Sequence, residues 1–250
     1  MASRKASSSE HPMPAPNTPA SQDHSTPSQE AARSIRHPLA MTLLTLTFTT
    51  GLLDAVSYLG LDHVFTANMT GNVVLLGFGI AGSGNLPVLA PLVSLAAFLL
   101  GAGVGGLLAS NLAENHRRHI AWALAIEGAL LAAACLLAAA VDVRPNVLSG
   151  DSVIALLAFA MGVRNATVRR IAVPDLTTTV LTMTLTGLAA DSTLFGGSGK
   201  GSSRRTAAVI AILTGALAGA LLLNASLALP LAVAAALAFA ALLLYPRTVS

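Results

Sequence analysis

The sequence is poor in cysteine, aromatic residues and charge. Its single cysteine, Cys135, cannot form a disulfide within the chain. Only 10% of the residues are charged and 4% are aromatic, whereas 54% are hydrophobic and the mean hydropathy is +0.72. A soluble chain of 250 residues needs far more charge to cover its surface. The composition therefore excludes an ordinary soluble domain and is typical of closely packed helices in lipid.

Motifs for catalysis and for metal or cofactor binding are also missing. The sequence has no Cys-His metal spacing, no HExxH and no nucleophile elbow. The segment 196–203 (GGSGKGSS) looks like a phosphate-binding loop, but Gly201 rather than Ser or Thr follows Lys200, and no strand is predicted before it. The net charge of +3 comes from basic residues between apolar runs, where they set membrane orientation. We therefore expect no enzyme, no metal, no cofactor and no nucleic-acid partner.

A polar tail precedes one helical membrane domain. Residues 1–38 are rich in Ser, Pro, Gln and His and are expected to be disordered, because they cannot bury a core. Residues 39–246 form the transmembrane domain. A helical span needs about 20 apolar residues. Six runs are long enough, and they are 39–61, 88–112, 119–141, 150–171, 206–226 and 228–246. Two further segments, 64–83 and 176–195, are shorter or more polar.

The two shorter segments leave two topologies open. As re-entrant elements they give six spans, and as full spans they give eight. Six spans with the N-terminus inside leave only Arg144 on the outer side, whereas eight spans also move Arg117, Arg118, Arg169 and Arg170 outside. The positive-inside rule favours six. We therefore expect a multi-pass protein of the cell inner membrane with both termini in the cytoplasm.

Two stretches of the sequence repeat each other. Residues 48–82 (FTTGLLDAVSYLGLDHVFTANMTGNVVLLGFGIAG) and 159–191 (FAMGVRNATVRRIAVPDLTTTVLTMTLTGLAAD) both begin with Phe, two further residues and Gly. Both then place a polar residue before Ala, which is Asp54 in the first copy and Asn165 in the second, and both continue into a Thr-rich segment. A polar element that recurs in two halves of a membrane protein is a pointer to a central binding site.

A second match supports duplication. Residues 97–109 (AFLLGAGVGGLLA) correspond to 211–223 (AILTGALAGALLL), and each copy contains Gly-x-x-x-Gly. The four glycines also make a homo-oligomer possible, because this motif lets helices approach closely. They are Gly101, Gly105, Gly215 and Gly219. With three spans in each half, about 39–141 and 150–246, the halves would insert in opposite orientations as an inverted repeat. Eight spans would instead give a parallel repeat.

Ionisable residues inside the apolar runs are the first candidates for a site. Asp54 lies in the outer part of the first span, where an ionised carboxylate costs several kcal/mol unless it is paired or hydrated. It is either a proton, cation or substrate site, or a buried group that fixes packing. Arg164 is its expected partner, with snorkelling toward the inner surface as the alternative. Glu127 and Asp191 either join a proton relay or serve only in packing or at an interface.

The segment Phe65-Thr66-Ala67-Asn68-Met69-Thr70-Gly71-Asn72 is the densest polar signal. Asn68 and Asn72 are four residues apart, so on a helix they face the same way. Such side chains bind substrate, coordinate a cation or receive a half-helix end. The alternative is interhelical hydrogen bonding alone. The full set of candidate substrate or ion ligands is Asp54, Asn68, Thr70, Asn72, Arg164, Asn165, Thr177 and Thr179.

These residues resemble a family signature. Gly51, Asp54 and Ala55, followed by FTANMTGN at 65–72, look like the pattern of the YoaK-like family, known as domain of unknown function 1275. In the second half, GVRNA at 162–166 and VPDLTTT at 173–179 resemble the echo of that pattern. The resemblance covers about residues 39–246. It implies a multi-pass membrane protein of a bacterial and fungal family without an established activity.

The combined prediction is an all-α polytopic bundle with two related three-span halves and short polar or re-entrant helices. We expect secondary transport or export of a small molecule or ion by rocking of the halves around a polar site at the midplane of the bilayer. The alternative is a non-transporting membrane protein that assembles with or regulates a partner. The Gly-x-x-x-Gly motifs and the absence of catalytic motifs fit this alternative.

Overall fold

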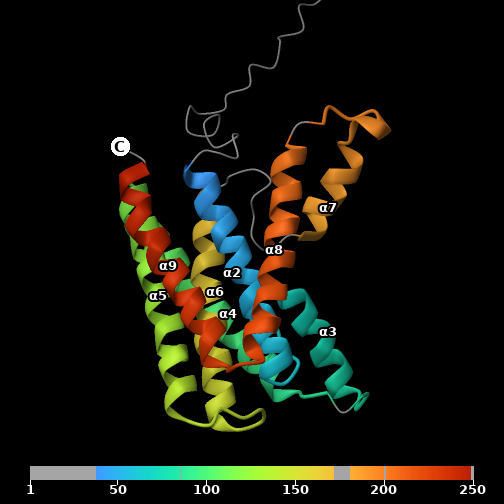
Figure 1. Cartoon of the computed structure of the whole chain (residues 1–250), viewed down its shortest axis with the longest axis vertical. Helices are drawn as coiled ribbons and strands as arrows, with labels where there is room; N and C mark the ends of the chain where they lie inside the picture. Colours follow the sequence, from blue (N-terminus) through green and yellow to red (C-terminus); the bar gives the residue numbers. More distant parts are fainter. Residues whose placement is uncertain (1–37, 85, 172–180, 200, 249–250) are drawn as a thin grey trace, which may run out of the picture.

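The computed structural model describes residues 38–84, 86–171, 181–199 and 201–248, and these residues are all helical or in connections (Figure 1). No strand occurs in these ranges, so the predicted all-α class is confirmed. The elements are α2 (Pro38–Gly60), α3 (Met69–Ile80), α4 (Leu89–Asn111), α5 (His116–Ala140), α6 (Leu148–Ile171), α7 (Leu181–Ala190), η1 (Thr193–Phe195), α8 (Ser202–Leu223) and α9 (Ala228–Thr248). Apart from Pro38, the predicted disordered tail lies outside the described residues.

Each of the six predicted runs coincides with one long helix. Five of these are long and apolar enough to cross a membrane, namely Ala40–Gly60, Leu89–Asn111, His116–Ala140, Leu148–Arg170 and Ser202–Leu223. The described apolar part of α9, Ala228–Leu244, falls among the shorter helices, so a sixth span stays a prediction. With 12 residues, α3 is too short for a span of about 20 residues, and the described part of α7 has 10 residues. The length of α3 favours a re-entrant element over a full span.

Local sequence fixes where α3 begins and ends. The Asn68 side chain accepts a hydrogen bond from the Gly71 amide at 3.2 Å, which caps the helix N-terminus. Gly82 and Gly84 follow the helix with φ of +68° and +71°, a conformation that glycine adopts without a steric penalty. The connection then leads to α4. These signals set α3 as a short helix in the part of the chain predicted to be re-entrant.

Glycines bring α2 and α8 into backbone contact. A Cβ atom at Gly51 of α2 would overlap the carbonyl oxygen of Ile212 on α8. Conversely, a Cβ atom at Gly215 of α8 would overlap the carbonyl oxygen of Phe48 on α2. No larger residue fits at either position without separating the helices.

The same contact recurs between α4 and α6. A Cβ atom at Gly162 of α6 would overlap the carbonyl oxygen of Phe98, and one at Gly101 of α4 would overlap that of Phe159. These four residues are the repeat counterparts of Gly51, Ile212, Gly215 and Phe48. The two halves of the chain therefore use matching positions for matching contacts.

The second glycine of each Gly-x-x-x-Gly motif is also used within the chain. Gly105 packs on Ala166 of α6, and Gly219 packs on Ala55 of α2. The four glycines proposed for oligomerisation are thus occupied by neighbouring helices of the same chain. A homo-oligomer stays a prediction, and it would need other surfaces.

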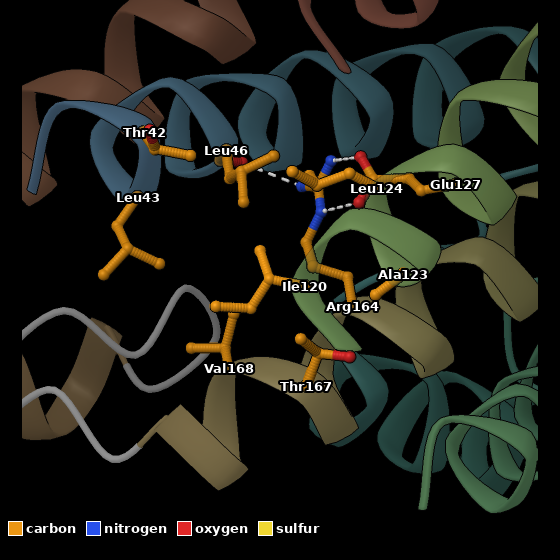
Figure 2. A pocket seen from close by; sticks show the side chains of 10 residues that line it. All are labelled: Thr42, Leu43, Leu46, Ile120, Ala123, Leu124, Glu127, Arg164, Thr167 and Val168. Atoms are coloured by element: carbon orange, nitrogen blue, oxygen red, sulfur yellow. Dashed lines mark hydrogen bonds and ion pairs between the residues drawn. The ribbon is translucent and has the colours of Figure 1, made fainter. Parts of the chain in front are cut away.

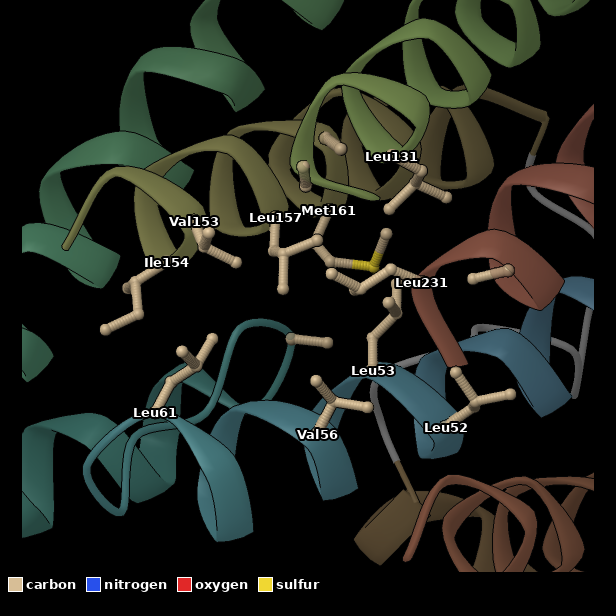
Figure 3. Close-up of a cluster of buried hydrophobic side chains, with 14 of the residues drawn as sticks. Leu52, Leu53, Val56, Leu61, Leu131, Val153, Ile154, Leu157, Met161 and Leu231 are labelled. Carbon is tan, nitrogen blue, oxygen red and sulfur yellow. The ribbon is translucent and has the colours of Figure 1, made fainter. Parts of the chain in front are cut away.

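Two apolar clusters fill the centre of the bundle. The larger one lies where α2, α5, α6 and α9 meet, and it includes Leu53, Leu131, Leu157, Met161 and Leu231, all fully buried (Figure 3). The smaller one joins the first part of α2 to the start of α5 and the end of α6. Along these three helices, polar residues lie between the two clusters, and they are Thr49 and Thr50 on α2, Glu127 on α5, and Arg164 and Asn165 on α6.

Candidate functional site

A buried ion pair occupies the polar layer between the two apolar clusters. Arg164 of α6 and Glu127 of α5 have side chains that are each 1% exposed. The Arg164 Nε donates to Glu127 Oε2 at 2.9 Å, and Nη2 forms the second bond of the pair to Oε1 (Figure 2). This two-bond arrangement is the strongest geometry that arginine and a carboxylate adopt.

Helix α2 supplies the remaining acceptors of Arg164. Nη1 donates to the Leu46 carbonyl oxygen at 2.8 Å and to Thr50 Oγ1 at 3.0 Å, while Nη2 donates to Thr49 Oγ1 at 2.8 Å. A guanidinium has five N–H donors, and all five are used. The network therefore ties α6 to both α2 and α5, with its charge fully compensated.

The predicted pairing of Arg164 with Asp54 is wrong, and so is the snorkelling alternative. Arg164 is 2% exposed and lies level with Thr49 and Thr50, whereas Asp54 lies a further turn along α2. Glu127 is closer because α5 and α6 are consecutive antiparallel helices, and the two residues stand at similar distances from their connection. Counting residues outward from that connection would have found the pair.

The cavity beside the ion pair is too small for a substrate. It measures about 20 Å³ and is lined mainly by apolar side chains such as Leu46, Ile120 and Val168 (Figure 2). A water molecule needs roughly 10–15 Å³ on this measure, so the cavity holds about one. The Arg164 network is thus a structural centre rather than a binding pocket.

The Asp54 carboxylate organises the connection between α2 and α3. Its Oδ1 atom accepts from the Thr66 amide at 2.9 Å, from the Ala67 amide at 2.8 Å and from Thr66 Oγ1 at 3.4 Å. All three donors are neutral. Among the described residues, no arginine, lysine or histidine forms an ion pair with Asp54.

Asn72 holds the same connection from the other side. Its Oδ1 accepts from the Phe65 amide at 2.9 Å, and its Nδ2 donates to the Phe65 carbonyl oxygen at 2.6 Å and to Ser94 Oγ at 3.0 Å. Asn72 is fully buried, whereas Asn68 is exposed. The predicted shared face is wrong, because Asn68 precedes the helix with φ −91° and ψ 78° and serves as its cap.

The other candidates of the first half line a pocket of about 720 Å³ between α2, α3, α7 and α8. Among the described residues, its polar lining consists of Thr50, Asp54, Tyr58, Asn68, Thr70 and Thr182. Its apolar lining includes Val74, Leu181 and Ile212. The volume lies within the roughly 300–1,000 Å³ of small-molecule sites. Residues of both halves contribute, since α7 and α8 belong to the second.

The second-half candidates are more dispersed. Asn165 donates to the Met161 carbonyl oxygen at 2.8 Å and lines a separate pocket of about 650 Å³ with residues of α4 and with Arg169 and Arg170. Asp191 forms an ion pair of 2.6 Å with Arg205, which links α7 to α8. Thr177 and Thr179 lie outside the described residues.

The described residues offer no candidate metal site. They contain no group of three or more His, Cys, Asp or Glu side chains that could hold a metal ion. The described residues that line the 720 Å³ pocket supply one carboxylate, one side-chain amide and four hydroxyl groups.

Comparisons with known proteins agree with this description. No solved structure matches the chain. The UPF0700 transmembrane protein YoaK of Bacillus subtilis (strain 168) is 37% identical over 154 residues, which cover 60% of this chain and 66% of that protein. The model of the family described as "Protein of unknown function (DUF1275)" matches residues 42–244. The chain is a multi-pass membrane protein that belongs to the DUF1275 family.

Proposed function

We propose that the chain is a secondary transporter of a small molecule or ion, and that the 720 Å³ pocket is its binding site. The observation that carries this proposal is the lining of that pocket. It combines the Asp54 carboxylate with polar side chains from α3 and α7, two short helices of opposite halves. Transporter sites commonly form where short or interrupted helices of two repeats meet.

The proposal includes an inverted repeat. Its support is the matching set of glycine contacts that pairs α2 with α8 and α4 with α6. Figure 1 adds that α2 and α6, which are repeat counterparts, run in opposite directions, and that α3 and α7 lie toward opposite ends of the bundle. Two halves related in this way allow the same site to open to either side.

Alternating access then involves two helix pairs as rigid units. Gly51 and Gly215 hold α2 against α8, and Gly101 and Gly162 hold α4 against α6. The hydrogen bonds from Arg164 to α2 connect the two pairs. In this proposal the pairs rock against each other, and the Arg164 bonds to α2 are contacts that change.

Cysteine accessibility tests the proposal. In a Cys135→Ser background, Thr70→Cys places a thiol in the pocket. Val73→Cys on the same helix is the control, because Val73 does not line the pocket and its 58% exposed side chain would face lipid in the proposed arrangement. We expect Thr70→Cys to react with a membrane-impermeant thiol reagent from each side of the membrane, and Val73→Cys from neither. Reaction of Thr70→Cys from one side only, in cells and in inverted vesicles, contradicts alternating access.

Orientation is tested with four further positions. In the same background, cysteines at Ser83 and Gly150 should label from outside intact cells, while those at Asn115 and Ser202 should be protected. Labelling of Asn115 alone from outside contradicts the inverted repeat. The alternative of a non-transporting partner protein loses one of its two supports, since the Gly-x-x-x-Gly motifs pack within the chain, and it keeps the other, which is the absence of catalytic motifs.

A further inference from the structure

We infer that the 720 Å³ pocket takes a small organic cation of the ammonium class, with Asp54 as its counter-charge. This inference rests on the proposed function and specifies its substrate class. It follows from three properties of the pocket, which are the sign of its charge, its aromatic surface and its size.

The charge of the pocket is negative. Asp54 is the only ionisable carboxylate among the described lining residues, and no arginine, lysine or histidine is among them. The amides of Thr66 and Ala67 orient the carboxylate without neutralising it, since both donors are uncharged. The N-terminus of α3 contributes at most about half an elementary charge. A positively charged ligand supplies the remaining compensation, and an anion would meet only repulsion.

Two aromatic rings form part of the same surface. Tyr58 and Phe65 both line the pocket and stack on each other, with ring centroids 4.9 Å apart and an angle of 23° between their planes. The face of such a ring attracts an ammonium group. A carboxylate next to aromatic rings is a combination that favours alkylammonium groups over strongly hydrated metal ions.

The size of the pocket and its apolar lining also favour an organic cation. A Ca²⁺ or Mg²⁺ ion takes about six or more oxygen ligands, and it needs a far smaller space than 720 Å³. Val74, Leu181 and Ile212 provide an apolar surface beside the polar groups. This surface matches the alkyl part of an organic cation, whose charged end lies near Asp54.

Calorimetric titration of the full chain in lipid nanodiscs tests the inference. The probes are tetramethyl-, tetraethyl- and tetrabutylammonium, with benzenesulfonate as the anion and sodium as the inorganic cation, all at equal ionic strength. We expect at least one ammonium probe to bind. Benzenesulfonate and sodium should give no more heat than they give in the background titration into empty nanodiscs.

Variants locate the site. Asp54→Asn removes the charge but keeps an oxygen that accepts from Thr66 and Ala67, and it should weaken ammonium binding at least tenfold. Asp142→Asn, on an exposed side chain, is the matched control and should change nothing. Tyr58→Leu should weaken binding about 2- to 30-fold, whereas Tyr58→Phe, which keeps the ring, should retain it.

The outcomes separate the two proposals. Absence of binding by all three ammonium probes, or equal binding to wild type and Asp54→Asn, overturns the cation inference. Binding of benzenesulfonate in their place overturns it too, but leaves transport through the pocket standing. Ammonium binding together with one-sided labelling of Thr70→Cys supports the cation site and contradicts transport. If Asp54→Asn does not fold, the pair Tyr58→Leu and Tyr58→Phe decides.

Discussion

The charged groups at Arg164 and at Asp54 lie in the same helix bundle but are satisfied in opposite ways. Arg164 has an ionised partner and an acceptor for every N–H, and the cavity beside it holds about one water molecule. Asp54 has only neutral donors and faces a pocket of about 720 Å³. This difference in compensation is why the proposed binding site is placed at Asp54 and not at Arg164.

Breaking the Arg164 centre should have the largest effect. Glu127→Gln leaves the guanidinium without its counter-ion in a buried site, which costs about 3–5 kcal/mol of folding stability. The double variant Glu127→Leu with Arg164→Met removes both charges and should recover much of this loss. Thermal unfolding in nanodiscs measures each variant. Arg144→Met, in a pair that is 72% exposed on both sides, is the control and should change stability by at most about 0.5 kcal/mol.

A double variant as unstable as Glu127→Gln would show that the network does more than balance charge. It would then also be needed to hold α2 against α6 through Thr49 and Thr50.

A glycine substitution should come next in size. A Cβ atom at Gly101 overlaps the Phe159 carbonyl oxygen, so Gly101→Ala must push α4 away from α6 and should cost about 1–3 kcal/mol. Gly103→Ala on the same helix is the matched control, because its Cβ atom meets nothing within 4 Å. It should stabilise the helix by up to about 1 kcal/mol. Equal melting temperatures for the two variants would contradict the tight α4–α6 contact.

The stability of the connection between α2 and α3 should depend on the hydrogen-bond acceptors of Asp54 rather than on its charge. Asp54→Leu leaves the amides of Thr66 and Ala67 without their acceptor, at a cost of about 1–3 kcal/mol for each group. Asp54→Asn keeps an acceptor and should cost less than about 1 kcal/mol. Thermal unfolding without ligand compares them. If Asn destabilises as much as Leu, the charge itself holds the connection and the contrast with Arg164 is weaker.

Loss of a single helix cap should have a small effect, and it distinguishes the two asparagines of the FTANMTGN segment. Asn68→Ala removes only the cap on Gly71 and should cost about 1 kcal/mol. Asn72→Ala removes the bonds to both Phe65 backbone groups and to Ser94, and it should cost more. Amide exchange of residues 65–68 is the measurement. Faster exchange in Asn68→Ala than in Asn72→Ala would contradict the assigned roles.

The sequence predicted the long helices because length and apolar composition decide which segments cross a bilayer. It also identified Gly101 and Gly215 as positions of close helix approach, but it proposed them for a homo-oligomer, whereas they pack on helices of the same chain, since the spacing of glycines says nothing about the partner. The partner of Arg164 was missed for a similar reason. Pairing depends on the level at which side chains of different helices meet, and the repeat pointed to Asp54 while the antiparallel hairpin of α5 and α6 brings in Glu127.

The roles of the candidate residues were predicted unevenly. Asp54 and Thr70 line the 720 Å³ pocket, where their role in binding stays a prediction, whereas Asn72 is buried and bonds to Phe65 and Ser94. The helical spacing of Asn68 and Asn72 misled because a cap residue leaves the helical path one position before Met69. No periodicity argument places such a boundary to within one residue.

The glycine contacts also bear on how the protein is made. The close backbone contacts of α2 with α8 and of α4 with α6 each join an element of residues 39–141 to one of residues 150–246, so α2 and α4 leave the ribosome before their partners α8 and α6 exist. Until then, their glycine faces lack the partners that they have in the folded bundle. Insertion of the first half is therefore separable from its final packing. If the chain is divided within the 141–147 connection and the two pieces are synthesised together in one cell, the pieces contain every surface needed to assemble the bundle.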